Sequence, residues 1–136
     1  RLSPSGHRVR PWEFFVVEDK ETLSALSVSK ASGASPVGRA AAAIVVAADT
    51  TKTDVWVEDC SIATIIMQLA AEELGLGSCW IHRAKEVFED EEGKELLKSL
   101  GVEGEYVDIG HCILGYPEVV NKNIIPRKDG RVFRVY

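Results

Sequence analysis

One long apolar segment, residues 56–81, constrains the fold of this chain more than any other part of its sequence. Its length corresponds to about seven turns of helix. Apolar side chains cover far more of its surface than the one-third stripe that is typical of a helix at a protein surface. They are Val57, Cys60, Ala63, Ile65, Ile66, Met67, Leu69, Ala70, Ala71 and Leu74. We therefore expect a helix that is covered on several sides, by its own sheet and by a second subunit.

Both ends of this helix carry recognisable signals. Gly75 and Gly77 follow its last apolar turn, and glycine adopts the left-handed conformation after a helix without a clash of Cβ. Residues 78–81, directly after these glycines, are expected to form a tight loop whose backbone can approach a cofactor. At the other end, Thr53 or Asp54 is expected to cap the first turn.

The size and charge of the chain limit what it can be. Its 136 residues predict a single domain, residues 1–136, with a sizeable core. The formal net charge of −5 argues against nonspecific nucleic-acid binding, which needs a basic surface. No membrane span is expected, because polar side chains interrupt the longest apolar segment. These are Glu58, Asp59, Gln68, Glu72 and Glu73.

The cysteines indicate a cellular compartment. Cys60, Cys79 and Cys112 lie in apolar surroundings, and no two of them form a CxxC pair. Such a pattern is typical of reduced core thiols in a cytoplasmic protein. The start of the sequence also shows no signal-peptide pattern.

The remaining pattern predicts an α+β domain, with helices packed against one sheet. Residues 41–48 form a continuous apolar run, which is expected of a central strand covered on both faces. Residues 30–38 are rich in Ser, Gly and Pro and are expected to be a loop. The other expected elements are strands at 13–18 and 106–114, helices at 22–29 and 91–100, one helical turn at 85–88, and a polar tail at 118–136.

Several kinds of active site are excluded by spacing. His7, His82 and His111 are far apart in sequence and have no partner at metal-ligand spacing, so no metal site is expected. Ser61 and Cys60 lie within the long helix, where neither is presented as a nucleophile. No G-x-G-x-x-G fingerprint is present. We therefore expect no side-chain nucleophile.

Two features remain as candidate binding sites. The first is the loop 4–12, which offers Arg8, Arg10 and backbone N–H groups; the alternative is a plain surface turn. The second is the pair Arg127 and Lys128 in the tail, suited to a phosphate by its charge; the alternative is a solvated tail. On the residues alone, dimer formation and binding of an anionic cofactor stay open.

Four blocks of this sequence resemble the FMN-dependent nitroreductases. Residues 56–81 resemble the central helix of that family and the loop after it, and residues 3–12 resemble its flavin loop, usually of the form APSxxNxQPW. Residues 107–117, with DIGHCILGYP, resemble its last sheet strand, and residues 126–128 resemble its C-terminal phosphate-binding segment. The blocks occur in the family's order and cover nearly all of the chain.

This resemblance implies a fold and an activity. The fold would be a mostly antiparallel central sheet flanked by helices, with the long helix buried at the interface of a homodimer. FMN would bind at that interface, take hydride from NADH or NADPH at its N5 atom, and pass electrons to nitroaromatics, quinones or similar acceptors by ping-pong kinetics. The resemblance implies no catalytic acid or base among the side chains, because flavin and water can supply the proton. The implied cofactor-binding residues are Pro4, Ser5, Gly6, His7, Arg8, Arg10, Trp80, Ile81, His82, Arg127 and Lys128.

The sequence also departs from the family pattern. Arg8 and Arg10 stand where the flavin loop of the family has Asn and Gln, and arginine can only donate hydrogen bonds. The family's N-terminal helix and its Arg-Arg-Ser segment, which grips FMN, have no counterpart, so we expect an N-terminally incomplete member. Two alternatives follow from these departures: a flavin-binding or sensing protein without turnover, and a cofactor-free dimer.

Overall fold

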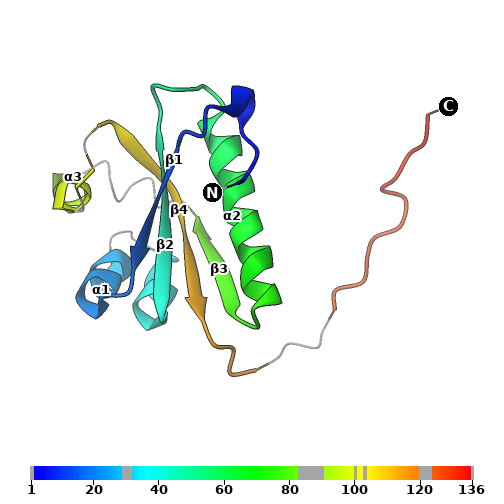
Figure 1. Cartoon of the computed structure of the whole chain (residues 1–136). Helices are drawn as coiled ribbons and strands as arrows, with labels where there is room; N and C mark the ends of the chain where they lie inside the picture. Colours follow the sequence, from blue (N-terminus) through cyan, green and yellow to red (C-terminus); the bar gives the residue numbers. More distant parts are fainter. Residues whose placement is uncertain are drawn as a thin grey trace.

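Four antiparallel strands form one sheet in the order β1-β2-β4-β3 (Figure 1). They are β1 Trp12–Val17, β2 Ala42–Asp49, β3 Gly77–His82 and β4 Tyr106–Gly115. The computed structural model describes residues 2–28, 32–82, 91–99, 101–102, 104–119 and 124–135. All three strand pairs are antiparallel, which confirms the predicted fold class.

Helices cover both faces of this sheet (Figure 1). The long helix α2, Trp56–Glu73, packs on one face, where its Cys60 and Ala63 share a core cluster with Trp12 of β1. The other face is covered by α1 Lys20–Val28, a short 3-10 helix η2 Ser35–Arg39 and α3 Glu91–Ser99, which bury Leu23, Leu26, Val37 and Leu97. β2 lies between the two cores, as its apolar sequence predicted.

The expected loop after the long helix is in fact a strand. Gly77–His82 pairs with β4 along its whole length, from Gly77 opposite Gly115 to His82 opposite Gly110. The loop prediction was wrong because a short apolar strand directly after an apolar helix gives no change in hydrophobic pattern. Only the glycines mark the boundary. Gly75 has a φ of 72°, and the Leu76 N–H donates to the carbonyl of Ala71, which ends the helix as predicted.

The N-terminal end of α2 also differs from the prediction. Its N-cap residue is Val55, which makes no side-chain cap, and neither Thr53 nor Asp54 takes that position. The Thr53 hydroxyl instead accepts a hydrogen bond from the Val55 N–H at 3.2 Å, one residue outside the helix. The N–H of Asp59 is satisfied by the backbone carbonyl of Val55 at 3.0 Å.

The remaining predicted elements are close to those observed. α1 begins earlier than expected because Asp19 accepts hydrogen bonds from the N–H and the hydroxyl of Thr22, both at 2.7 Å, and these bonds lower the pKa of Asp19. The prediction of a loop at 30–38 was wrong in part, since η2 begins at Ser35 and buries Val37. The turn expected at 85–88 lies outside the described residues. None of the helices in the described part of the chain combines the length and apolar character that crossing a bilayer would require.

The long helix is buried on one side only within this chain. Its outer face carries Ile62, Ile65, Ile66 and Leu69, which are between 39% and 65% exposed. Asp59, Cys60, Ala63, Thr64 and Ala71 make up its buried set. Within the single chain the sheet covers one face of the helix, as expected, and cover of the other face by a second subunit stays a prediction.

The three thiols differ in exposure and reactivity. All are free; Cys60 and Cys112 are buried, whereas Cys79 is exposed, which corrects the prediction that all three are core thiols. Burial, reinforced by the carboxylates of Asp59 and Asp108, raises the pKa of Cys60 to about 12. Burial also raises the pKa of Cys112. Since the thiolate is the reactive form, these two thiols are inert in the folded chain.

Alkylation with iodoacetamide at pH 8 tests this difference. We expect Cys79 to be modified in the folded protein, while Cys60 and Cys112 react only as fast as the chain unfolds. Peptide mass spectrometry along a time course measures each rate. Modification of Cys60 as fast as Cys79 under native conditions would contradict the burial described here.

Candidate functional site

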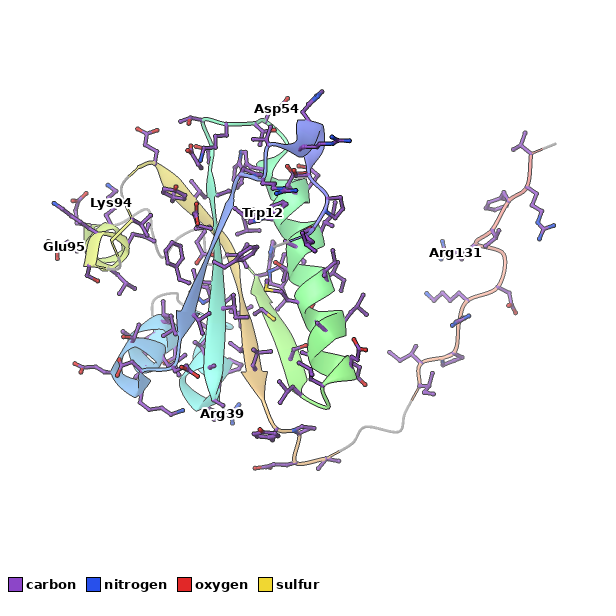
Figure 2. The ribbon with its side chains drawn as sticks, viewed as in Figure 1. Trp12, Arg39, Asp54, Lys94, Glu95 and Arg131 are labelled. Carbon is purple, nitrogen blue, oxygen red and sulfur yellow. The ribbon has the colours of Figure 1, made fainter. Side chains whose placement is uncertain are left out.

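The segment before β1 forms a loop with an unusual backbone. It contains a short 3-10 turn, η1 Gly6–Arg8, and lies at the same end of the sheet as Asp54 (Figure 2). Three non-glycine residues have left-handed φ angles: His7 at 50°, Arg8 at 62° and Arg10 at 53°. Each such residue costs about 1–2 kcal/mol for an L-amino acid. Strained residues persist only where the surrounding structure fixes them, and they concentrate at ligand-binding segments.

A buried carboxylate from α2 anchors this loop. Asp59 is only 3% exposed, and its Oδ1 accepts a hydrogen bond from the Gly6 N–H at 2.8 Å. A Cβ at Gly6 would lie 2.7 Å from Cγ2 of Val55, so the chain can pass close to the helix only as glycine. The first turn of α2 therefore fixes the place where the loop begins.

Further hydrogen bonds close the loop on itself. The N–H of Arg10 donates to the Ser5 hydroxyl at 3.0 Å, and the N–H of Arg8 donates to the Ser5 carbonyl at 3.1 Å. The Pro11 carbonyl accepts from the Asp49 N–H at 3.0 Å, which ties the loop exit to the end of β2. Pro4, His7, Arg8 and Arg10 remain exposed, so the loop presents one basic outer surface.

Sequence reasoning missed Asp59 as part of the site. It counted this carboxylate only among the polar side chains that interrupt the longest apolar segment. A signal was present, since Asp59 interrupts an apolar run at a position facing the core. In the structure its Oδ2 is buried and has no hydrogen-bond partner among the described residues.

The end of β3 forms the second part of the site. Trp80 and His82 project on the face that α2 covers, with ring centroids 5.7 Å apart and ring planes at 90°. Ile81 points to the opposite face, where it is 5% exposed and belongs to the other core cluster. Of these three predicted residues, Trp80 and His82 therefore share a surface, and Ile81 can contribute only its backbone there.

The N-terminal half of α2 brings these two parts together. Asp59 holds the loop, and the next inward-facing residues, Cys60 and Ala63, belong to the cluster against which Trp80 packs. A hollow of about 540 Å³ opens beside the loop, a volume within the usual range for small-molecule sites. It is lined by Arg10, Trp12, Glu13, Phe14, Val16, Ile44 and Met67.

The predicted phosphate-binding residues lie elsewhere. Residues 124–135 form an extended, exposed tail that leaves the sheet beyond β4, and Arg131 marks its position (Figures 1 and 2). Arg127 and Lys128 belong to this tail, so the single chain does not bring them to the loop. Their role stays a prediction. Within the described residues, no three His, Cys, Asp or Glu side chains are grouped to ligate a metal ion.

A model of the Nitroreductase family matches residues 28–116. The chain belongs to the nitroreductase family. That match includes β2, α2, β3 and all of β4, and so covers Asp59 and the Trp80–His82 pair.

Two archaeal relatives agree with this assignment. The "Putative NADH dehydrogenase/NAD(P)H nitroreductase" of Archaeoglobus fulgidus is 39% identical over 122 residues, which cover 86% of this chain and 67% of that protein. A protein of the same name from Methanothermobacter thermautotrophicus is 41% identical over 80 residues, which cover 57% of this chain and 41% of that protein. The chain thus spans only part of the length of both relatives.

Solved structures of nitroreductases share the fold. The FMN-dependent nitroreductase of Clostridium difficile R20291 has a TM-score of 0.78 and 40% identity, covering 91% of this chain and 73% of that one. A nitroreductase with bound FMN from Bacteroides fragilis has a TM-score of 0.81 and 26% identity, covering 99% of this chain and 81% of that one.

Replacement of Asp59 tests the anchor. Asp59→Ala leaves the partly buried Gly6 N–H without an acceptor, so we expect it to lower the free energy of unfolding by about 1–3 kcal/mol. Asp59→Asn keeps an acceptor oxygen and should lose less. Glu58→Ala, on the exposed side of the same turn, is the matched control. Urea unfolding measures all three, and equal stability of Asp59→Ala and Glu58→Ala would disprove the anchor.

Proposed function

We propose that this chain is a single FMN-binding domain of a homodimeric oxidoreductase that uses NADH or NADPH. One observation carries the proposal: the first turns of α2 contact both the basic loop and the end of β3, two of the segments that resemble the family. Support comes from the solved nitroreductase structures, one described as FMN-dependent and another containing bound FMN. Residues 1–136 would act as one unit.

The residues around the loop fit an anionic aromatic cofactor. The hollow beside the loop has an aromatic and aliphatic floor from Trp12, Phe14 and Met67, and Arg10 stands at its edge. A planar apolar ring needs such a floor, and its anionic groups need a cation and N–H donors. In this proposal Pro4, Ser5, Gly6 and His7 line one edge of FMN, and Arg8 and Arg10 supply positive charge.

The chemistry that FMN supplies when bound is hydride acceptance from NADH or NADPH and electron delivery to an acceptor such as a nitroaromatic or a quinone. The donor and the acceptor would use the same site in turn, which gives ping-pong kinetics. Backbone groups of Trp80, Ile81 and His82 would position the reacting edge of the ring. Arg8 and Arg10 would favour the reduced ring by offsetting its negative charge.

The tail would serve the phosphate group. Arg127, together with Lys128, has the charge for this contact. Because both lie on an exposed tail remote from the loop of their own chain, the contact requires the tail to fold back or to come from a second subunit. A second subunit would also cover the apolar outer face of α2. The three free thiols favour a cytoplasmic location.

A second candidate function is flavin binding or sensing without turnover. It is favoured by Arg8 and Arg10, which hold left-handed conformations where the family loop has amides. The two functions differ in one measurement, steady reduction of an acceptor by the purified protein. Sustained reduction with NADH or NADPH would exclude the sensing function.

Titration with FMN, followed by quenching of flavin fluorescence, tests the binding step first. We expect saturation near one FMN per chain. Anaerobic stopped-flow mixing of the loaded protein with NADH and then NADPH tests the redox step, and loss of flavin absorbance is the expected result. If FMN binds but neither nucleotide bleaches it, the oxidoreductase function is wrong and the sensing function remains.

Substitution in the tail tests the phosphate assignment. Arg127→Ala should weaken FMN binding by about 10- to 150-fold, which corresponds to the roughly 1.5–3 kcal/mol of a hydrogen bond to a charged group. The loss should be greater at low salt than at high salt because salt screens exposed charges. Arg131→Ala, which removes another exposed tail cation, is the control. An equal FMN affinity in both variants would remove Arg127 from the site.

A further inference from the structure

β4 carries a buried acid–base pair that the proposed chemistry does not use. Asp108 is 0% exposed and His111 is 1% exposed. The Oδ2 of Asp108 lies 2.6 Å from Nε2 of His111, and its Oδ1 accepts a hydrogen bond from the Gly110 N–H at 2.7 Å. The Asp108 carboxylate therefore contacts both the backbone of Gly110 and the side chain of His111 on its own strand. Burying such a pair costs free energy that a pair of apolar side chains would not cost, so stability alone does not explain it.

The pair lies at a bulge in the sheet. Val46 of β2 faces Gly110, whereas the next residue, Ala47, faces Asp108, so Ile109 is the extra residue. Ile109 turns into the core under α2, where it is 7% exposed. Bulges re-aim neighbouring side chains and occur often beside active sites. The Asp108 carboxylate stabilises this bulge, because it accepts the Gly110 N–H on the other side of the extra residue.

The indole of Trp80 packs directly against Gly110. A Cβ at this position would collide with Nε1 of Trp80 and would lie 2.8 Å from its Cδ1 and 2.9 Å from the Ile81 carbonyl oxygen. The indole ring therefore rests on the bare Cα of Gly110. The same indole meets His82 edge to face. The position of Gly110 thus decides where both rings at the end of β3 lie.

We propose that Asp108 and His111 are positioning residues, which hold the bulge at Ile109 and thereby place the rings of Trp80 and His82. The Asp108 carboxylate fixes the backbone of Gly110. The indole of Trp80 packs against Gly110 in the space that a Cβ would occupy, and it orients the imidazole of His82. His111 holds the carboxylate in the rotamer that reaches the Gly110 N–H. The consequence for the cofactor rests on the proposed function, since Trp80 and His82 belong to the proposed FMN site.

Fluorine NMR of the chain labelled with 5-fluorotryptophan tests the placement without any cofactor. The chain has three tryptophans, and Trp80→Phe identifies the Trp80 signal. We expect Asp108→Ala to shift or broaden that signal and to leave the Trp56 signal unchanged. Asp108→Asn keeps an acceptor for the Gly110 N–H and should restore most of the native signal. Val37→Ala, which removes buried volume on the other side of the sheet, controls for lost stability.

A second pair of variants keeps the test decisive if Asp108→Ala does not fold. His111→Gln retains a donor for Asp108 and should leave the Trp80 signal near its native position, whereas His111→Leu removes the donor and should displace it. Identical Trp80 signals in these two variants would overturn the role of His111. A native Trp80 signal in folded Asp108→Ala, or an equal shift in Val37→Ala, would overturn the role of Asp108.

FMN titration of the same variants tests the link to the site. We expect Asp108→Ala to weaken FMN binding by about tenfold, equivalent to about 1.4 kcal/mol, and Val37→Ala to leave it nearly unchanged. Equal affinities in both variants, with the Trp80 signal displaced in Asp108→Ala alone, would overturn the link to FMN. Failure of the unaltered chain to bind FMN would overturn the proposed function instead, and the fluorine signals would still decide the positioning role.

Discussion

The hydrogen bond from the Gly6 N–H to the buried carboxylate of Asp59 is the contact on which the candidate site depends. It joins a loop with three left-handed non-glycine residues to a helix that the sheet already holds in place. Without that acceptor, a partly buried donor would lose its partner and the loop would lose its fixed starting point. The basic outer surface of the loop exists because a carboxylate on its inner side holds it.

Two buried carboxylates share this region of the core. Asp59 comes from α2 and Asp108 from β4, and both raise the pKa of the Cys60 thiol that lies near them. One oxygen of each carboxylate accepts a hydrogen bond from the N–H of a glycine, Gly6 for Asp59 and Gly110 for Asp108. In both cases the glycine is required because a neighbouring side chain occupies the space of a Cβ. Each half of the candidate site thus uses the same arrangement, a buried carboxylate that holds a glycine against a neighbouring side chain.

Most of the fold could be predicted from the sequence because its strongest signals are long and periodic. The apolar run of β2, the long helix and its glycine stop, and the strand 106–114 all appear in the structure with shifts of one or two residues. β3 could not be predicted, since an apolar strand that directly follows an apolar helix shows no break in pattern. Residues 4–11 form one loop, as expected. The contacts of Asp59 and Asp108 could not be predicted, because the first joins residues about 50 positions apart and the second depends on a bulge, and no local pattern encodes either.

The rigidity of the loop has a consequence for the speed and selectivity of recognition. Its backbone is fixed by contacts within the chain, through Asp59, Ser5 and Asp49, before any ligand arrives. The entropy of ordering this segment is therefore lost during folding and does not recur at each encounter. A ligand that matches the preset shape and cations of the loop docks without waiting for the loop to rearrange, whereas one of the wrong shape meets a surface that does not adapt to it.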